Sequence, residues 1–292
     1  MYPYLNLGFI HPGTFGLLLW LAAVAATVVL HWNFERNGVE ADALNVVAVV
    51  VIAGVIGAKA WHELEDPREM RYALHAIGLP GWHHPWELAV RFLVWFQAGF
   101  AWFGGMLAGI VFLMLQGRAA RFRGALAGTL GERVGPIRML DLAAPAAALG
   151  YGIGGIGCLL SGDGDYGVNT TLPWGVRMAK DALVPPHPAD ALVQPTPVYE
   201  LLFSLVVCWV LWELGKRSKP VGWVTGVYLV LSGMGRFLVE FVRINPKLYF
   251  DHTLSNAQVA AAGSVMVGLA VVAAARSRGV QWSPEPAADL QT

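Results

Sequence analysis

Long runs of apolar residues dominate this chain, and polar residues gather between the runs instead of alternating with apolar ones. A helix of about 20 apolar residues crosses the hydrocarbon core of a bilayer, because lipid offers no hydrogen-bond partner to a free backbone. Seven stretches qualify, at about 14–32, 44–62, 95–116, 139–160, 198–214, 221–242 and 255–275. The pattern predicts an all-α integral membrane protein with seven transmembrane helices.

Composition agrees with this prediction. Hydrophobic residues make up 56% of the chain and charged residues only 14%, which is more apolar than a soluble core absorbs. The formal net charge is zero, so bulk charge gives no argument for nucleic acid, and none is expected as a partner. Cys158 and Cys208 both lie in apolar stretches, where a small buried side chain is the simplest interpretation. We therefore expect no disulfide, no metal site and no cofactor.

The distribution of basic residues predicts the orientation in the membrane. Lysine and arginine gather after the third stretch, after the fifth and after the seventh, at Arg118, Arg121, Arg123, Arg133, Arg138, Lys216, Arg217, Lys219, Arg276 and Arg278. The connections before the third stretch and after the fourth lean acidic, with Glu63, Glu65, Asp66, Glu69, Glu87, Asp163, Asp165, Asp181 and Asp190. Basic connections face the cytoplasm, so seven spans place the N-terminus outside and the C-terminus in the cytoplasm. No lysine or arginine precedes the first stretch, and we expect that helix to be retained and not cleaved as a signal peptide.

The sequence predicts one membrane domain, a long loop within it and a disordered tail. Residues 1–278 form a single seven-helix membrane domain. Within it, about 161–197 form a long external loop between helices four and five, rich in proline and without periodicity, which is typical of a lid or docking loop. Residues 279–292 form a short cytoplasmic tail that we expect to be disordered.

Charged residues inside the sixth stretch are the strongest functional signal. Arg236, Glu240 and Arg243 are spaced by four and three residues, which predicts one face of a helix, with Arg236 about two turns inside the outer end. A guanidinium group makes paired hydrogen bonds to phosphate oxygens, and a carboxylate one turn away orients it. The alternative is structural, with Arg236 and Glu240 neutralising each other while Arg243 reaches the head-group layer.

Other polar and small residues fall at the same depth under this topology. Lys59 closes the second stretch, Gly104 and Gly105 open the third, and Gln258 opens the seventh. We therefore expect these residues to converge at the external third of the bilayer.

The fourth stretch ends in a glycine-rich run that opens into carboxylates. Gly157 and its neighbouring glycines fit close helix packing. The segment beyond it, which carries Asp163 and Asp165, is too polar for packing and is typical of a loop lining a cavity.

The ordered motifs of the chain resemble those of the bacterial prolipoprotein diacylglyceryl transferases. They are Phe-Gly-Gly at 103–105, Gly-Ile-Gly-Cys-Leu-Leu-Ser-Gly-Asp-Gly-Asp-Tyr-Gly at 155–167, Pro-Thr-Pro-Val-Tyr-Glu at 195–200, Gly-Arg-Phe-Leu-Val-Glu-Phe-Val-Arg at 235–243 and Leu-Ser-Asn-Ala-Gln at 254–258. The resemblance implies a seven-span enzyme of the bacterial inner membrane. It also implies transfer of a diacylglyceryl group from phosphatidylglycerol to the lipobox cysteine of a preprolipoprotein, with glycerol phosphate released.

Residue pattern and resemblance together nominate the site. The catalytic candidates are Arg236, Glu240 and Asp163. The phospholipid-binding candidates are Arg236, Arg243, Lys59, Gly104, Gly105, Gly157, Tyr199 and Gln258, and Glu200 matches the family motif beside Tyr199. The implied partners are phosphatidylglycerol, the lipobox peptide of a preprolipoprotein and membrane lipid.

Several positions depart from the family pattern. Phe103 stands in place of a histidine, Gly155 in place of the signature arginine, Cys158 in place of an asparagine and Gln194 in place of a histidine, and Leu19 lies near a lost tyrosine. The missing arginine removes positive charge from the departing phosphate. Arg236, Arg243 or Lys59 then has to supply that positive charge. Glu240 or Asp163 has to accept the proton of the thiol.

Three functions stay open on the sequence. The first is the transferase itself, the second a paralogue with the same lipid pocket and another acceptor, and the third a lipid-binding membrane protein without turnover. A transporter is disfavoured, since the chain shows no internal repeat.

Overall fold

The computed structural model describes residues 8, 13–78, 84–97, 101–124, 132–162, 165–178, 191–217, 219–249, 252–279 and 281–282. Six of its helices are long and apolar enough to cross a membrane, and they are α1 (Thr14–Arg36), α2 (Ala43–Glu65), α5 (Trp102–Ala119), α7 (Pro136–Ser161), α8 (Thr196–Leu214) and α10 (Asn256–Arg278). A shorter apolar helix, α9 (Trp223–Val239), occupies the sixth predicted stretch. The prediction of a helical membrane protein is therefore confirmed.

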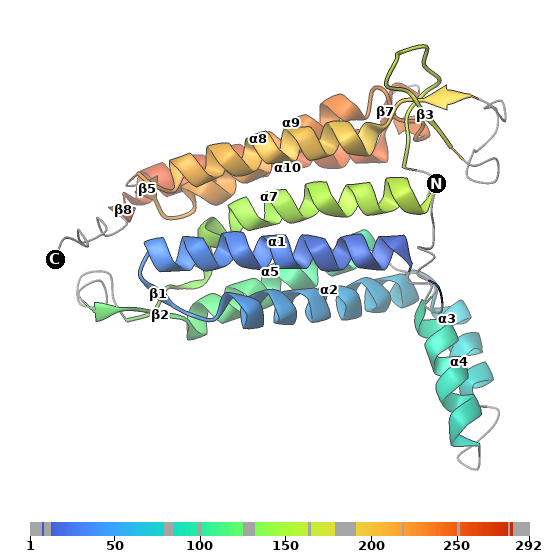
Figure 1. The fold of residues 1–292 in the computed structure, drawn as a ribbon. Helices are drawn as coiled ribbons and strands as arrows, with labels where there is room; N and C mark the ends of the chain where they lie inside the picture. The colour runs from blue at the N-terminus through green and yellow to red at the C-terminus, as the bar shows by residue number, and fades with distance from the viewer. Residues whose placement is uncertain are drawn as a thin grey trace.

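The long helices lie roughly antiparallel in one bundle (Figure 1). Helix α1 packs on α7, α2 on α5, α7 on α8, and α9 on α10. Large apolar side chains also point outward, among them Trp20, Ile52 and Met266, each at least 60% exposed. A surface of this kind suits contact with lipid tails, where outward apolar residues carry no hydrophobic cost.

Helices α3 (Pro67–Gly78) and α4 (Pro85–Gln97) form an arm that projects from one end of the bundle (Figure 1). The prediction of a single helix over 95–116 is wrong at its start, because α4 ends at Gln97 and α5 begins at Trp102. The apolar run continues across both helices, so hydrophobicity alone does not reveal the break.

Short antiparallel strand pairs close the two ends of the bundle (Figure 1). One end carries β3 (Val176–Arg177) paired with β4 (Leu192–Val193), and β6 (Lys247–Tyr249) paired with β7 (Leu254–Ser255). We call it the loop end, since the predicted external loop begins there.

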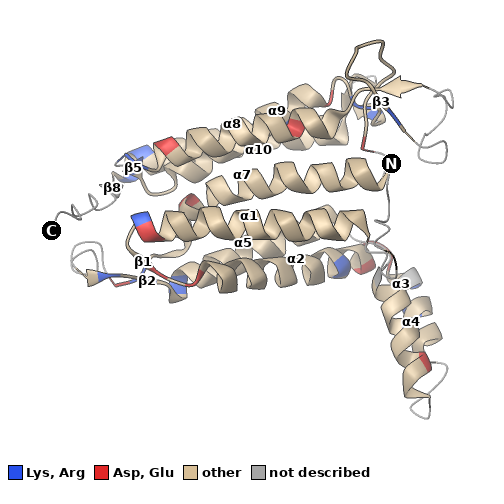
Figure 2. Cartoon of the chain, viewed as in Figure 1, with Lys and Arg blue, Asp and Glu red and all other residues tan. Residues whose placement is uncertain are grey.

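The opposite end carries β1 (Val39–Glu40) paired with β2 (Arg121–Phe122), and β5 (Lys219–Pro220) paired with β8 (Gln281–Trp282). Lysine and arginine gather here (Figure 2), and we call it the basic end.

Close helix contacts rely on glycine in the pair α9 and α10. A Cβ on Gly268 would lie 2.7 Å from the carbonyl oxygen of Gly226, and one on Gly226 would lie 2.9 Å from that of Gly268. The two backbones approach so closely that side chains do not fit between them. This contact joins the start of α9 to the second half of α10, and Gly233, with a Cβ position 2.7 Å from the carbonyl oxygen of Ala261, continues the close approach toward the polar residues of the site.

Candidate active site

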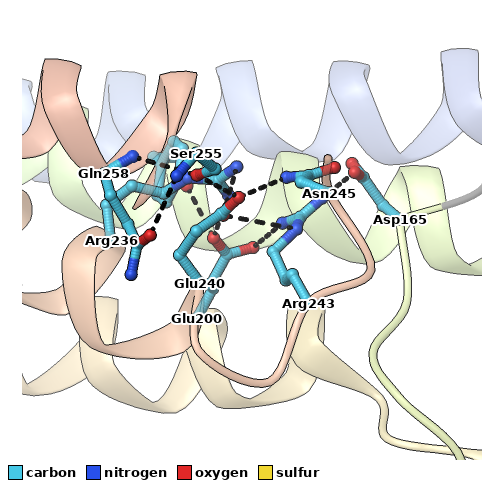
Figure 3. Close-up of polar contacts among 9 residues, drawn as sticks. Asp165, Glu200, Arg236, Glu240, Arg243, Asn245, Ser255 and Gln258 are labelled. Atoms are coloured by element: carbon cyan, nitrogen blue, oxygen red, sulfur yellow. Dashed lines mark hydrogen bonds and ion pairs between the residues drawn. The ribbon is translucent and has the colours of Figure 1, made fainter. Parts of the chain in front are cut away.

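Glu200 forms the centre of a polar site at the loop end of the bundle. Its Oε1 accepts hydrogen bonds from Arg236 Nη1 at 2.7 Å and from the Tyr151 hydroxyl at 3.0 Å, and its Oε2 accepts one from Arg243 Nη1 at 3.3 Å (Figure 3). The carboxylate sits in the first turns of α8, whereas Tyr151 comes from α7 and Arg236 from α9. Charge-assisted hydrogen bonds of this kind are the strong ones, so Glu200 links three helices.

Glu240 supplies a second carboxylate that is 2% exposed. Its Oε2 lies 3.2 Å from Arg236 Nη2, while its Oε1 accepts hydrogen bonds from Ser255 Oγ at 2.8 Å and Asn245 Nδ2 at 2.6 Å (Figure 3). Glu240 Oε2 also lies 3.9 Å from Arg243 Nε. Arg236 is therefore held between carboxylates from two helix ends.

Arg243 ties the segment after α9 to the segment after α7. Its Nη2 pairs with Asp165, and its backbone forms a bridge with Gly167. The amide of Val168 donates to the carbonyl of Val242 at 2.8 Å. The part of the predicted external loop that directly follows α7 is thus fastened to the chain beside Arg243.

The prediction that Arg236, Glu240 and Arg243 share a helix face is wrong. Helix α9 ends at Val239, so Arg236 lies in its last turn and not two turns inside it. Glu240 follows as the C-cap and Arg243 lies in the bridge beyond. Pro246 disfavours helical backbone just before it, and the chain turns back instead. The three side chains still meet.

We call Asp165, Glu200, Arg236, Glu240 and Arg243 the ionic cluster. It contains two guanidinium groups and three carboxylates, so its formal charge among the described residues is one negative unit. The side chain of Arg236 is 28% exposed and that of Arg243 only 5%. Arg236 is therefore the more accessible of the two guanidinium groups, and it is already paired with two carboxylates, Glu200 and Glu240.

Gln258 adds an uncommitted donor beside the ionic cluster. It belongs to a capping box at the start of α10, in which its Oε1 accepts from the backbone amide of Ser255 at 3.0 Å. Its Nε2 is buried and has no hydrogen-bond partner within the described residues. An unpaired buried N–H group costs about 1–3 kcal/mol, and an acceptor oxygen of a ligand removes that cost.

The structure does not bring Lys59 into the ionic cluster. Lys59 Nζ lies 2.8 Å from Glu63 Oε1, donates to the carbonyl of Trp95 at 2.8 Å and sits 4.4 Å from the centre of the Trp95 ring. It lines a separate cavity of about 470 Å³ between α2, α3 and α4, whose lining does not include Arg236. Its role in phospholipid binding stays a prediction.

Three of the nominated glycines lie at helix contacts. A Cβ on Gly104 would overlap the Gly57 carbonyl of α2, and one on Gly157 would lie 3.2 Å from Leu18 Cβ of α1. A Cβ on Gly105 would lie 3.1 Å from the carbonyl oxygen of Gly54. All three allow close packing, and their predicted contact with lipid remains untested.

Two candidates remain, Tyr199 and Asp163. The hydroxyl of Tyr199 accepts a hydrogen bond from Trp174 Nε1 at 2.8 Å, so it contacts the segment after α7. Asp163 lies outside the described residues.

Sequence reasoning missed the central position of Glu200 and missed Tyr151 altogether. The Tyr-Glu motif pointed to Glu200, but nothing in the motif showed that both arginines converge on it. Tyr151 interrupts a run of glycines on α7, and that interruption is its only sequence signal.

Comparison with known proteins decides the family. The family model described as prolipoprotein diacylglyceryl transferase matches residues 4–274. The chain belongs to the prolipoprotein diacylglyceryl transferase family. The resemblance inferred from the motifs is thereby confirmed.

Relatives named phosphatidylglycerol–prolipoprotein diacylglyceryl transferase match along most of their length. The Clostridium tetani protein is 26% identical over 258 residues, covering 88% of this chain and 90% of the relative. The Leptospira interrogans protein (serovar Lai) is 28% identical over 255 residues, covering 82% and 73%. The Leifsonia xyli protein is 27% identical over 277 residues, covering 94% and 77%.

Gly155 is the position at which the resemblance to the family implies an arginine, and it lies next to Glu200. A Cβ on Gly155 would lie 3.8 Å from Pro197 Cβ and 4.0 Å from Glu200 Oε2. A Cβ at this position therefore fits without overlap and lies next to Glu200. In this chain the guanidinium groups at Glu200 come from Arg236 and Arg243 instead.

Proposed function

We propose that this chain transfers a diacylglyceryl group from phosphatidylglycerol to the lipobox cysteine thiol of preprolipoproteins. The convergence of Arg236 and Arg243 on Glu200, with Arg236 the more accessible guanidinium, is the observation that carries the proposal. The printed names of the relatives support the same substrates.

The proposed setting is a bacterial inner membrane crossed seven times. Helix α9 has 17 residues and so a length of about 26 Å, close to the thickness of the hydrocarbon core. Counting it as a span places the ends of the chain on opposite sides. The basic end then faces the cytoplasm, and the loop end with the ionic cluster and the external loop faces outward.

Arg236 is proposed to hold the phosphate of the lipid. The peptide sulfur attacks the diacylglyceryl carbon, a carbon–sulfur bond forms, and the carbon–oxygen bond to the phosphate breaks. The electron pair leaves with glycerol phosphate, whose developing charge the guanidinium stabilises. The free Nε2 of Gln258 lies in the same site and suits an oxygen of the lipid.

The thiol proton passes to a carboxylate. Glu240 is already engaged on both oxygens, since Oε1 accepts hydrogen bonds from Ser255 and Asn245 and Oε2 lies 3.2 Å from Arg236 Nη2. We therefore assign Glu240 to positioning Arg236, and we assign the proton to the loop carboxylate predicted from the sequence, Asp163.

A lipid-binding protein without turnover is the second candidate. The excess of carboxylate over guanidinium in the ionic cluster and the glycine at position 155 favour it, since both reduce the positive charge available to a leaving phosphate. If this second candidate is correct, the protein binds phosphatidylglycerol but forms no lipidated preprolipoprotein.

Complementation tests the two candidates directly. The chain replaces the diacylglyceryl transferase of a bacterium that requires one, and radiolabelled phosphatidylglycerol is followed onto a lipobox substrate. Growth with labelling supports the transferase. Binding of phosphatidylglycerol without growth or labelling supports the second candidate and refutes the first.

Arg236→Lys tests the role of the forked guanidinium. Lysine keeps the charge but loses the paired geometry, so we expect transfer to fall at least about tenfold, as for loss of one charge-assisted hydrogen bond. Arg217→Lys, at an exposed site of the basic end, is the control and should leave the rate unchanged. Equal rates in Arg236→Lys and wild type would contradict the proposed phosphate contact.

A further inference from the structure

A small cavity lies at the basic end of the bundle, opposite the ionic cluster. It has a volume of about 260 Å³ and is formed by the start of α7, the turn before α9 and the end of α10. Its walls include the apolar side chains of Ile137, Val221 and Ala275. Arg138 and Arg278 also line it, and no carboxylate does among the described residues.

The two arginines differ in their surroundings. Arg278 is exposed and has no ion-pair partner in the part of the chain that the structure describes. The guanidinium of Arg138 lies 5.7 Å from the centre of the Phe122 ring. The exposed guanidinium of Arg278 and the partly buried guanidinium of Arg138 make the opening of the cavity positively charged.

The carboxylate nearest in sequence to Arg138 is already engaged. Asp141, one turn along α7, accepts hydrogen bonds from the Gly222 amide at 2.6 Å and from the Thr225 amide at 2.7 Å, and a third from the Thr225 hydroxyl at 2.6 Å. It caps the start of α9 from a neighbouring helix. Asp141 therefore holds the start of α9 and does not line the cavity.

The same end of the bundle carries further cations around a tryptophan, close in sequence to residues that line the cavity. Arg276 lies 4.5 Å and Lys219 lies 5.7 Å from the centre of the Trp223 ring. Lysine and arginine are concentrated at this end (Figure 2). Tryptophan beside lysine and arginine is typical of the depth at which lipid head groups begin.

We propose that this cavity binds the phosphate head of an anionic phospholipid in the leaflet opposite the ionic cluster. Arg138 and Arg278 take the phosphate oxygens, and the apolar walls take the glycerol and the first acyl carbons. Basic pockets between membrane helices on the cytoplasmic side recognise anionic head groups in this way. The site is independent of the transfer reaction and binds its lipid as a lasting partner of the fold.

Site-mapped photocrosslinking tests the proposal on the full chain. The purified protein is incubated in detergent with photoactivatable phosphatidylglycerol, and labelled peptides are identified by mass spectrometry. We expect a label near 134–138 or 275–278, separate from any label at the ionic cluster. The same probe with a phosphatidylcholine head should label this position at least about tenfold less.

Variants at the mouth define the charge dependence. Arg278→Glu should reduce labelling of this cavity at least about tenfold, and Arg278→Gln, which adds no negative charge, about fivefold, since each basic group near the surface contributes about 1 kcal/mol. Labelling at the ionic cluster should persist. Arg217→Glu at the same end lies outside the cavity lining and should change nothing.

Competition separates a lipid from a simple anion. Soluble glycerol phosphate at millimolar concentration should fail to displace the lipid label, because it makes no contact with the apolar walls. Displacement by glycerol phosphate, equal labelling by the phosphatidylcholine probe, or unchanged labelling in both Arg278 variants would each overturn the proposal.

Discussion

At the scale of single residues, Glu200 is more central to the site than any residue nominated from the pattern of charges. It is buried and contacts Arg236, Arg243 and Tyr151, so its charge neutralises guanidinium groups that have little access to water. Removing one partner of a buried ion pair is costly because it leaves the other charge unpaired.

Glu200→Gln tests this role. We expect the protein to lose about 3–5 kcal/mol of stability and most of its transfer activity, since the buried guanidinium of Arg243 and the partly exposed one of Arg236 both lose a counter-charge. Thermal unfolding in detergent and the labelling assay measure the two effects. Glu213→Gln on the same helix is the control, because Glu213 is an exposed partner of Lys216 and should cost less than about 1 kcal/mol. Similar losses in both variants would contradict a central role for Glu200.

Gly155→Arg tests the consequence of the missing signature arginine. The Cβ fits without overlap and lies 4.0 Å from Glu200 Oε2, so we expect an added guanidinium there to raise phosphatidylglycerol affinity and transfer about tenfold. Gly155→Gln, similar in length but neutral, should give no such gain. A gain in both variants would show that packing, and not charge, limits the site.

At the scale of helices, apolar length was enough to locate the bundle from sequence. Each predicted stretch has a helix, because lipid forces the backbone of a long apolar run to satisfy its own hydrogen bonds. The same signal is blind to breaks, which explains the missed end of α4 at Gln97 and the missed end of α9 at Val239. Beyond the end of α9 the chain bridges to a distant segment instead, through Gly167 and Arg243, and apolar length contains no signal for such a contact.

The site could be predicted only in part for the same reason. Arg236, Glu240, Arg243 and Gln258 were found because charged and polar groups stand out in apolar sequence. The pairing of both arginines with Glu200, and the separation of Lys59 from them, depend on how helices far apart in sequence pack. Helix periodicity contains no such information.

The contact of α9 with α10 gives a prediction at this scale. Gly268→Val should destabilise the protein by about 1–3 kcal/mol, because a side chain there overlaps the backbone of Gly226 and Val230. On the same helix, Gly263 has no atom within 4 Å of its Cβ position, so Gly263→Val should be neutral or slightly stabilising. Unfolding temperatures in one detergent compare the two, and equal shifts would argue against a tight contact.

At the scale of the whole molecule, the two ends of the bundle differ in charge and in structure. The ionic cluster and the segments after α7 and α9 lie at the loop end, while lysine and arginine gather at the basic end (Figures 1 and 2). This difference is what makes the proposed orientation testable.

Single cysteines measure the orientation. In a background with Cys158→Ala and Cys208→Ala, we expect Leu172→Cys to react with a membrane-impermeant maleimide in intact cells and Arg217→Cys to react only after lysis, because the two lie at opposite ends of the bundle. Both positions are exposed. Reaction of Arg217→Cys in intact cells would reverse the proposed topology.

The attachment of Arg243 has one more consequence. Its backbone bridges Gly167 and its guanidinium pairs with Asp165, so the stretch that follows α7 and a cation that neutralises Glu200 are mechanically joined. Displacing that stretch by a few ångströms redistributes charge around Glu200 with every helix left in place. We therefore expect a ligand that binds to this stretch to change the charge around Glu200 as well.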